Sequence, residues 1–138
     1  MSAADAKALI RAHYDAVINW FEPDAIRAQI ADGYFDHGSG RMLSADDVIA
    51  YAQKLHTTFA ELSVIIYEMI AEGDRVAVRE SWRGVHAGPF HGLAATGRRF
   101  SLTGMVFWRL RCGKIAERWP EIDTRRLLAQ LRDTPSAA

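Results

Sequence analysis

The sequence predicts a single α+β domain, with helices in its first half and long antiparallel strands in its second half. Apolar residues recur every three or four positions across residues 3–21, which is typical of an amphipathic helix. Beyond Phe59 this repeat gives way to segments rich in branched and aromatic residues, which favour strands. Residues 100–119 then predict a β-hairpin, because Cys112 and Gly113 form a two-residue turn between two such segments.

The N-terminal half begins with a helix predicted from Ala3 to Phe21. Pro23 ends this helix and can occupy the first turn of a short second helix over residues 24–30. Residues 33–37 predict a short extended segment, which the glycine-containing turn at residues 38–40 closes.

A third helix is predicted to begin after Ser44. Asp47 follows Ser44 by three residues, a spacing that resembles a capping box. The positions that recur at helical spacing, and so define the buried face, are Val48, Tyr51, Ala52, Leu55 and Phe59.

Residues 62–71 predict a strand that is apolar on both faces. Leu62, Val64, Ile66 and Ile70 would lie on one face, and Ile65, Tyr67 and Met69 on the other. Such a strand needs cover on both sides, whereas three helices can cover one side of a curved sheet. We therefore expect the second side to meet another copy of the chain in a homodimer, to which Met105 and Phe107 would contribute.

The C-terminal half continues with a turn at residues 73–74, a long strand over residues 75–86 and a loop over residues 88–97. The hairpin follows, and Asp123 can cap a short last helix. Residues 132–138 are expected to form a frayed tail of the single domain 1–138.

The charge balance excludes several classes of partner. Seventeen basic and seventeen acidic residues leave no net charge, so neither nucleic acid nor a membrane surface is an expected partner. The N-terminus lacks the apolar run of a signal peptide, and Cys112 is the single cysteine of the sequence. These features predict a cytoplasmic protein.

Metal and nucleotide sites are not expected. The five histidines include no pair four residues apart on a predicted helix, and Cys112 has no cysteine partner. No glycine-rich phosphate-binding motif is present in the sequence. We therefore expect chemistry without a metal or another cofactor.

The hairpin also carries a family resemblance. The motif TGRRF at residues 96–100, the GKI turn at residues 113–115 and the ERW segment at residues 117–119 occur in one order, preceded by AEGDRVAVRESW. This order resembles the SnoaL-like polyketide cyclase branch of the NTF2-like superfamily over about residues 7–131. The resemblance implies a cone-shaped fold, in which a strongly curved, mostly antiparallel sheet wraps against three N-terminal helices and a short C-terminal helix follows.

The same resemblance implies an open interior that binds an apolar or aromatic small molecule. It predicts an enzyme of the cyclase, isomerase or hydrolase type, which uses acid/base catalysis on an apolar substrate with a carbonyl group. The family aspartate that follows the E-x-W segment is replaced here by Pro120. The alternative is therefore a protein of the same fold that binds a small ligand without turning it over.

Three polar residues are candidates for the chemistry. The resemblance places His37 in the pocket as an acid/base group, although it can equally be a core or rim histidine bonded to backbone. Glu121 is the second acid/base candidate, and its alternative is a surface residue or a salt-bridge partner. By the same resemblance Arg118 takes the pocket-facing place of the family's usual histidine; it could bind a ligand oxygen, or else pair with Glu80 or Glu121.

The remaining candidates would shape the pocket wall and contact substrate. They are Trp82, Gly104, Val106 and Trp108. For the two tryptophans, the alternative is an ordinary role in the core or at an interface.

Overall fold

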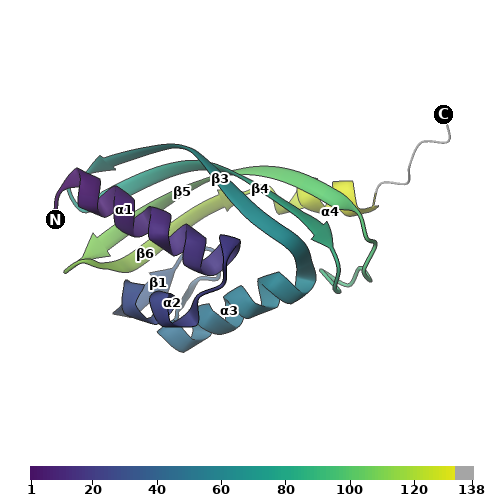
Figure 1. The fold of residues 1–138 in the computed structure, drawn as a ribbon, viewed down its shortest axis with the longest axis horizontal. Coiled ribbons are helices and arrows are strands. Elements are labelled where there is room, and N and C mark those ends of the chain that lie inside the picture. Colours follow the sequence, from purple (N-terminus) through teal and green to yellow (C-terminus); the bar gives the residue numbers. More distant parts are fainter. Residues whose placement is uncertain (133–138) are drawn as a thin grey trace.

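A computed structural model describes residues 1–132, in which long strands arch over a layer of helices (Figure 1). In chain order the elements are α1 (Ala3–Tyr14), the π-helix η1 (Asp15–Asn19), α2 (Pro23–Gln29), β1 (Ile30–Asp36), β2 (Arg41–Met42), α3 (Ala45–Thr58), β3 (Phe59–Glu72), β4 (Arg75–His86), β5 (Arg99–Arg111), β6 (Lys114–Ile122) and α4 (Thr124–Arg132).

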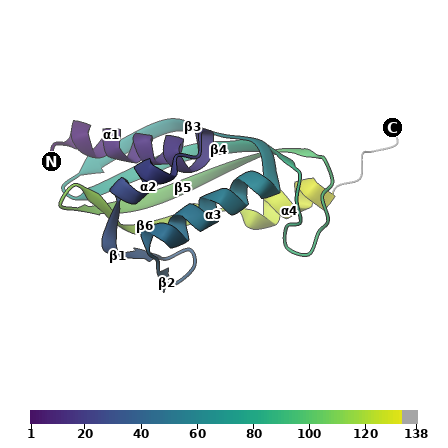
Figure 2. The same cartoon turned by 60° about the horizontal axis from the view of Figure 1, so that its bottom comes forward.

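The strands of the described part form one mixed sheet in the order β2-β1-β6-β5-β4-β3. Neighbouring strands are antiparallel except β1 and β6, which run parallel. Helices α1, α2 and α3 lie against the concave side of this sheet, and α4 follows at its far end (Figures 1 and 2). The predicted α+β fold with a curved, mostly antiparallel sheet, three N-terminal helices and a short C-terminal helix is confirmed.

The helix ends follow the side chains that cap them. Ser44 Oγ accepts a hydrogen bond from the Asp47 backbone N–H at 3.1 Å, and the Asp47 carboxylate accepts from the Ser44 N–H at 2.9 Å. This capping box confirms the predicted start of α3. Asp123 caps α4 through the Arg126 N–H at 2.9 Å. Arg132 still belongs to α4, so the predicted tail at residues 132–138 starts too early, and its other residues lie outside the described part.

The first helix differs from its prediction over residues 3–21. Its α-helical part ends at Tyr14, and the next five residues form the π-helix, closed by the Trp20 N–H donating to the Asp15 carbonyl at 2.9 Å. Phe21 then adopts a positive φ of 55°, which turns the chain into α2. Apolar spacing does not distinguish the wider π turn from an α turn, because both bury the same stripe.

Two side chains of strand β3 lie on the opposite face of the sheet from the one predicted. A register shift between Ile66 and Glu68 inserts an extra residue opposite β4. Such a bulge reverses the alternation beyond it. Ile70 therefore lies on the outer face and Met69 on the inner face, opposite to the predicted faces.

Pro120 does not interrupt the sheet. Strand β6 continues through it to Ile122, and Pro120 stays in register with Val106 of β5. The pairing of β6 with β1 ends at Arg118, so beyond that point one edge of β6 is free and a missing backbone donor breaks no bond to β1.

The outer face of the sheet carries an apolar patch. Its members each expose between 43% and 64% of their surface and are Ile65, Tyr67, Ile70, Met105 and Phe107. Arg79 lies among them, over the Tyr67 ring and paired with Glu68.

We expect this patch to join two copies of the chain, because an apolar surface of this kind rarely stays in contact with water. Light scattering should give about twice the 15.4 kDa of one chain. An interface of this kind should bury more than roughly 1,200 Å² in total. Phe107→Glu should shift the protein to monomer, whereas Met42→Glu, which changes an exposed apolar residue on β2, should leave the dimer intact. A monomer at micromolar concentration would contradict the prediction.

Candidate functional site

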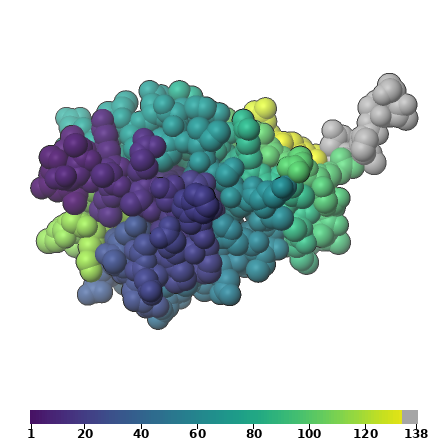
Figure 3. All heavy atoms as spheres, in the orientation of Figure 1, coloured from purple at the N-terminus to yellow at the C-terminus, as the bar shows by residue number. Residues whose placement is uncertain are grey.

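A cavity of about 810 Å³ lies between the helices and the inner face of the sheet. Helices α1 and α2 close over the sheet on the face seen in Figure 3, so this interior is partly screened from water. Its apolar wall includes Val17, Leu55, Phe59, Phe90, Phe100, Leu102 and Leu127. A cavity of this size and lining fits a small apolar or aromatic molecule.

Strand alternation decides which side chains face the interior. On β4 the inward positions are Val76, Val78, Glu80 and Trp82, each buried, while Arg79 points outward. A carboxylate therefore occupies one position of an otherwise apolar and aromatic row.

Glu80 is fully buried and both of its carboxylate oxygens are engaged. The Tyr14 hydroxyl donates to Oε1 at 3.1 Å, and the Trp82 indole N–H donates to Oε2 at 2.6 Å. The Trp108 indole N–H donates in turn to the Tyr14 hydroxyl at 3.4 Å. The result is a short chain of hydrogen bonds through Trp82, Glu80, Tyr14 and Trp108, all of which line the cavity.

Burial shifts both titrating groups of this chain. It raises the pKa of Glu80 above its usual value, against the opposing effect of the hydrogen bonds from Trp82 and Tyr14. Burial, together with the nearby Glu80 charge, also raises the pKa of Tyr14. Tyr14 thus keeps its proton at neutral pH, while the Glu80 carboxyl can exchange one closer to neutrality than an exposed carboxyl would.

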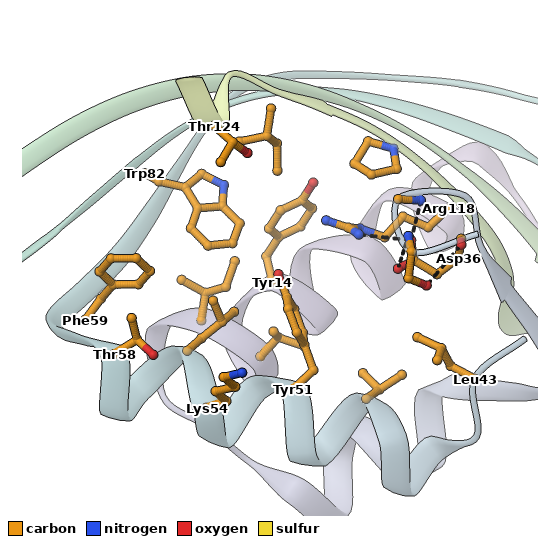
Figure 4. A pocket seen from close by; sticks show the side chains of 18 of the residues that line it. Tyr14, Asp36, Leu43, Tyr51, Lys54, Thr58, Phe59, Trp82, Arg118 and Thr124 are labelled. Carbon is orange, nitrogen blue, oxygen red and sulfur yellow. Dashed lines mark hydrogen bonds and ion pairs between the residues drawn. The ribbon is translucent and has the colours of Figure 1, made fainter. Parts of the chain in front are cut away.

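A second polar group lies opposite Trp82. Figure 4 shows Tyr14 in the middle of the cavity, with Trp82 on one side and the Arg118 guanidinium reaching toward it from the other. Arg118 donates to Asp36 Oδ1 at 3.1 Å and lies over the Trp108 ring. The Asp36 carboxylate also accepts the Gly38 and Ser39 backbone N–H groups. Arg118 is thus anchored by one nitrogen and keeps further donors for a ligand.

Tyr34 and Tyr51 add hydroxyl groups at the same end. Both line the cavity, and burial raises the pKa of Tyr34. Tyr51 retains 46% of its surface accessible, and Figure 4 shows that its ring projects from α3 into the cavity. Its accessible surface is available to a bound molecule.

Three of the predicted binding residues line the cavity. Arg118, Trp82 and Trp108 all do so. Arg118 pairs with Asp36, and not with Glu80 or Glu121, the two partners that the sequence suggested. Gly104 and Val106 lie on the inner face of β5 but do not line the cavity. Ile122 and Glu80 pack close to Gly104, which explains why it is covered.

The predicted positions of His37 and Glu121 in the pocket are wrong. His37 lies outside the cavity, stacked on Trp119 at 4.6 Å between ring centroids and bonded to Glu117 at 2.8 Å. His37 follows the last residue of β1 and lies beside the outward-facing residues of β6. Glu121 pairs with the outward-facing Met105 and is exposed, because Pro120 leaves the strand alternation unchanged.

Sequence reasoning missed Glu80 and Tyr14 as site residues. The signal was present in the spacing. Glu80 is two or four residues from Val76, Val78 and Trp82, so it shares their face of the strand, which is otherwise apolar. A carboxylate in phase with a buried row indicates a buried carboxylate. Tyr14 gave no such signal, because a tyrosine in a helical stripe is ordinary core.

Two further properties limit the kinds of site in the described residues. Across residues 1–132 no group of three or more His, Cys, Asp or Glu side chains is close enough together to hold a metal ion. No helix in that part is long and apolar enough to cross a membrane.

The curved sheet, the helices on its concave side and the cavity between them are those of an NTF2-like protein. The family model for SnoaL-like polyketide cyclases matches residues 8–131, and the chain belongs to this family. No curated protein sequence matches it.

Solved structures with the same fold agree with this assignment. TsrD from Streptomyces laurentii has a TM-score of 0.87 at 24% identity, covering 96% of this chain and 98% of its own. AclR from Streptomyces galilaeus, a proposed hydroxylase, has a TM-score of 0.82 at 28% identity, covering 98% and 87%. IdmH from Streptomyces antibioticus, a proposed polyketide cyclase, has a TM-score of 0.79 at 28% identity, covering 91% and 97%.

Proposed function

We propose that this protein is a cofactor-independent acid/base enzyme that moves a proton next to a carbonyl group of an apolar small molecule. The observation that carries the proposal is the buried Glu80 carboxylate, hydrogen-bonded to the Tyr14 hydroxyl in the wall of the cavity. Family membership and the apolar cavity support the same reading.

The proton would move through Tyr14. As the phenol oxygen takes a proton from the carbon beside the carbonyl, its own proton passes to Glu80 Oε1 over the existing 3.1 Å hydrogen bond. The C–H bond and the original Tyr14 O–H bond break, a new O–H bond forms on Tyr14, and a second forms on Glu80, whose carboxylate becomes a carboxylic acid. The Tyr14 phenolate never accumulates, since burial raises the pKa of the Tyr14 hydroxyl.

Arg118 would stabilise the charge that develops on the ligand. The electron pair released from the C–H bond ends on the carbonyl oxygen as an enolate, which needs a hydrogen-bond donor in a site with few water molecules. The guanidinium supplies such donors, and Asp36 fixes its orientation. Trp82, Trp108 and Tyr51 would hold the apolar body of the ligand.

A test that needs no knowledge of the natural substrate is hydrogen–deuterium exchange. In deuterium oxide, the protein should catalyse loss of the α-hydrogens of 2-acetylnaphthalene and related aryl ketones, followed by NMR. The rate should exceed that of an equal concentration of the Tyr14→Phe variant, which retains the ring but loses the hydroxyl. Equal exchange by the two proteins would reject Tyr14 as the proton-transferring group.

A binding protein without turnover remains the second candidate, favoured by one observation. Both Glu80 oxygens already accept hydrogen bonds inside the protein, as they would in a purely structural role. In that case the aryl ketones would bind, but the exchange experiment would show no exchange above that in the absence of the protein.

A further inference from the structure

His13 is a polar residue of the cavity that the proton transfer does not use. It lies on α1 immediately before Tyr14, is 4% exposed and lines the cavity. Its ring meets the Trp108 ring edge-on at 5.4 Å between centroids. Trp108 therefore contacts His13 and Tyr14 and also lies under Arg118.

Gln29 fixes the orientation of the His13 ring. The Gln29 side-chain oxygen lies 2.8 Å from His13 Nδ1, and this buried contact requires Nδ1 to carry the proton. In a neutral ring the other nitrogen, Nε2, is then a bare acceptor. The two ring nitrogens point in diverging directions, so Nε2 faces away from α2.

This acceptor makes no hydrogen bond with any described residue, yet it is not sealed off. Among residues 1–132, the fully enclosed side-chain nitrogen or oxygen without a partner is Nε2 of His86. His13 Nε2 is not fully enclosed in this way, and it therefore keeps access to the cavity that its ring lines. Burial, and to a smaller extent the charge of Arg118, lowers the pKa of His13 to about 4. The ring thus remains a neutral acceptor at physiological pH.

We propose that His13 Nε2 accepts a hydrogen bond from a hydroxyl group of the ligand, and so selects ligands that carry a phenolic or enolic O–H. Arg118 lies over the same tryptophan and can only donate. A ligand that satisfies both groups presents a hydroxyl to His13 and a carbonyl or anionic oxygen to Arg118. The site then distinguishes hydroxylated aromatic carbonyl compounds from their O-methylated or deoxygenated analogues.

The inference rests on the cavity of the proposed function but not on turnover, so binding and exchange experiments can fail separately. The probes are 2-naphthol and 2-methoxynaphthalene, which differ in the O–H donor. Binding is measured by calorimetry or by the fluorescence of the protein's tryptophans. The wild-type protein should bind 2-naphthol more tightly than the ether by roughly three- to tenfold.

The variant His13→Phe should bring that ratio close to one, because it keeps an aromatic ring against Trp108 but lacks Nε2. A matched control is His37→Phe, which changes the exposed histidine on the other face and should leave the ratio unchanged. An unchanged preference for 2-naphthol in folded His13→Phe would overturn the proposal.

A second measurement keeps the proposal testable if His13→Phe does not fold. The ¹⁵N NMR shifts of the wild-type His13 ring should show a protonated Nδ1 and an unprotonated Nε2, and 2-naphthol should move the Nε2 signal toward lower frequency, as a hydrogen-bonded acceptor requires. A ring protonated at Nε2, or an Nε2 signal that ignores 2-naphthol at saturation, would overturn it.

Discussion

Replacing Glu80 by glutamine should reduce the catalysed exchange of aryl-ketone α-hydrogens by about 10²- to 10⁴-fold, the usual contribution of a general base. Glutamine has nearly the same shape and can still accept from the Trp82 N–H, while its NH₂ group can donate to the Tyr14 oxygen. The network would stay connected, but it could no longer take up the proton that Tyr14 passes on. The measurement is the initial exchange rate at saturating ketone.

Controls separate this effect from a general disturbance. Glu121→Gln makes the same chemical change on the outer face of the sheet and should keep the exchange rate within about twofold. His37→Ala should do likewise, because its ring lies outside the cavity. A loss in Glu121→Gln as large as in Glu80→Gln would contradict the assignment of Glu80.

The pH dependence of exchange should follow the carboxyl group. The ionised form of Glu80 is the base, so the rate should rise with pH through the pKa of the folded protein, which burial places above the usual 4.5. The same shift predicts that ionising Glu80 costs stability as pH rises through this interval, because the folded state holds the proton more tightly than the unfolded chain. Glu80→Gln should lack the rising limb.

The fold could be predicted because its signals are local and repeated. Apolar spacing identified the three N-terminal helices, Cys112 and Gly113 identified the hairpin, and Ser44 with Asp47 identified a helix start. The π turn after Tyr14 and the bulge after Ile66 could not be predicted in this way. Each inserts a residue into a regular repeat, and the hydrogen bonds that decide it involve residues on other segments or turns.

The site was harder to predict because it depends on which face each residue takes. Arg118, Trp82 and Trp108 line the cavity as the sequence predicts, because alternation is regular along β4 and over residues 117–122 of β6, which pair in step with residues 104–109 of β5. His37 failed because it follows the end of β1, where alternation no longer constrains the side chain. Its partners, Glu117 and Trp119, face outward on the neighbouring strand.

The position of Glu80 also bears on the missing family aspartate. Pro120 faces the cavity in register with Val106, whereas Glu80 is in register with Gly104 and through it with Ile122. The carboxyl group thus lies on β4, across the sheet from the strand where the resemblance leads one to expect it. Because Gly104 has no side chain, the Glu80 side chain can lie close over the backbone of β5.

Replacing Arg118 by methionine should weaken the binding of 2-naphthoate by about 1.5–3 kcal/mol, the value of a hydrogen bond to a charged group, which is roughly a 10- to 100-fold rise in Kd. Methionine keeps apolar volume over Trp108 but removes every donor. Naphthalene, which has no oxygen, should bind both proteins equally. Isothermal calorimetry of the two ligands on the two proteins provides the comparison.

Arg109→Met is the matched control for this change. Arg109 lies on the outer side of β5 and pairs with Glu117 at 2.6 Å, so the substitution also removes an ion-paired arginine from the sheet but leaves the cavity intact. Arg118→Met should lower thermal stability as well, since Asp36 loses its charged partner and keeps the backbone donors of Gly38 and Ser39. Binding is therefore compared well below the unfolding transition of each variant. If Arg118→Met lost stability but bound 2-naphthoate as tightly as Arg109→Met does, Arg118 would be a structural partner of Asp36, and the enolate-stabilising role would pass to the tyrosine hydroxyls.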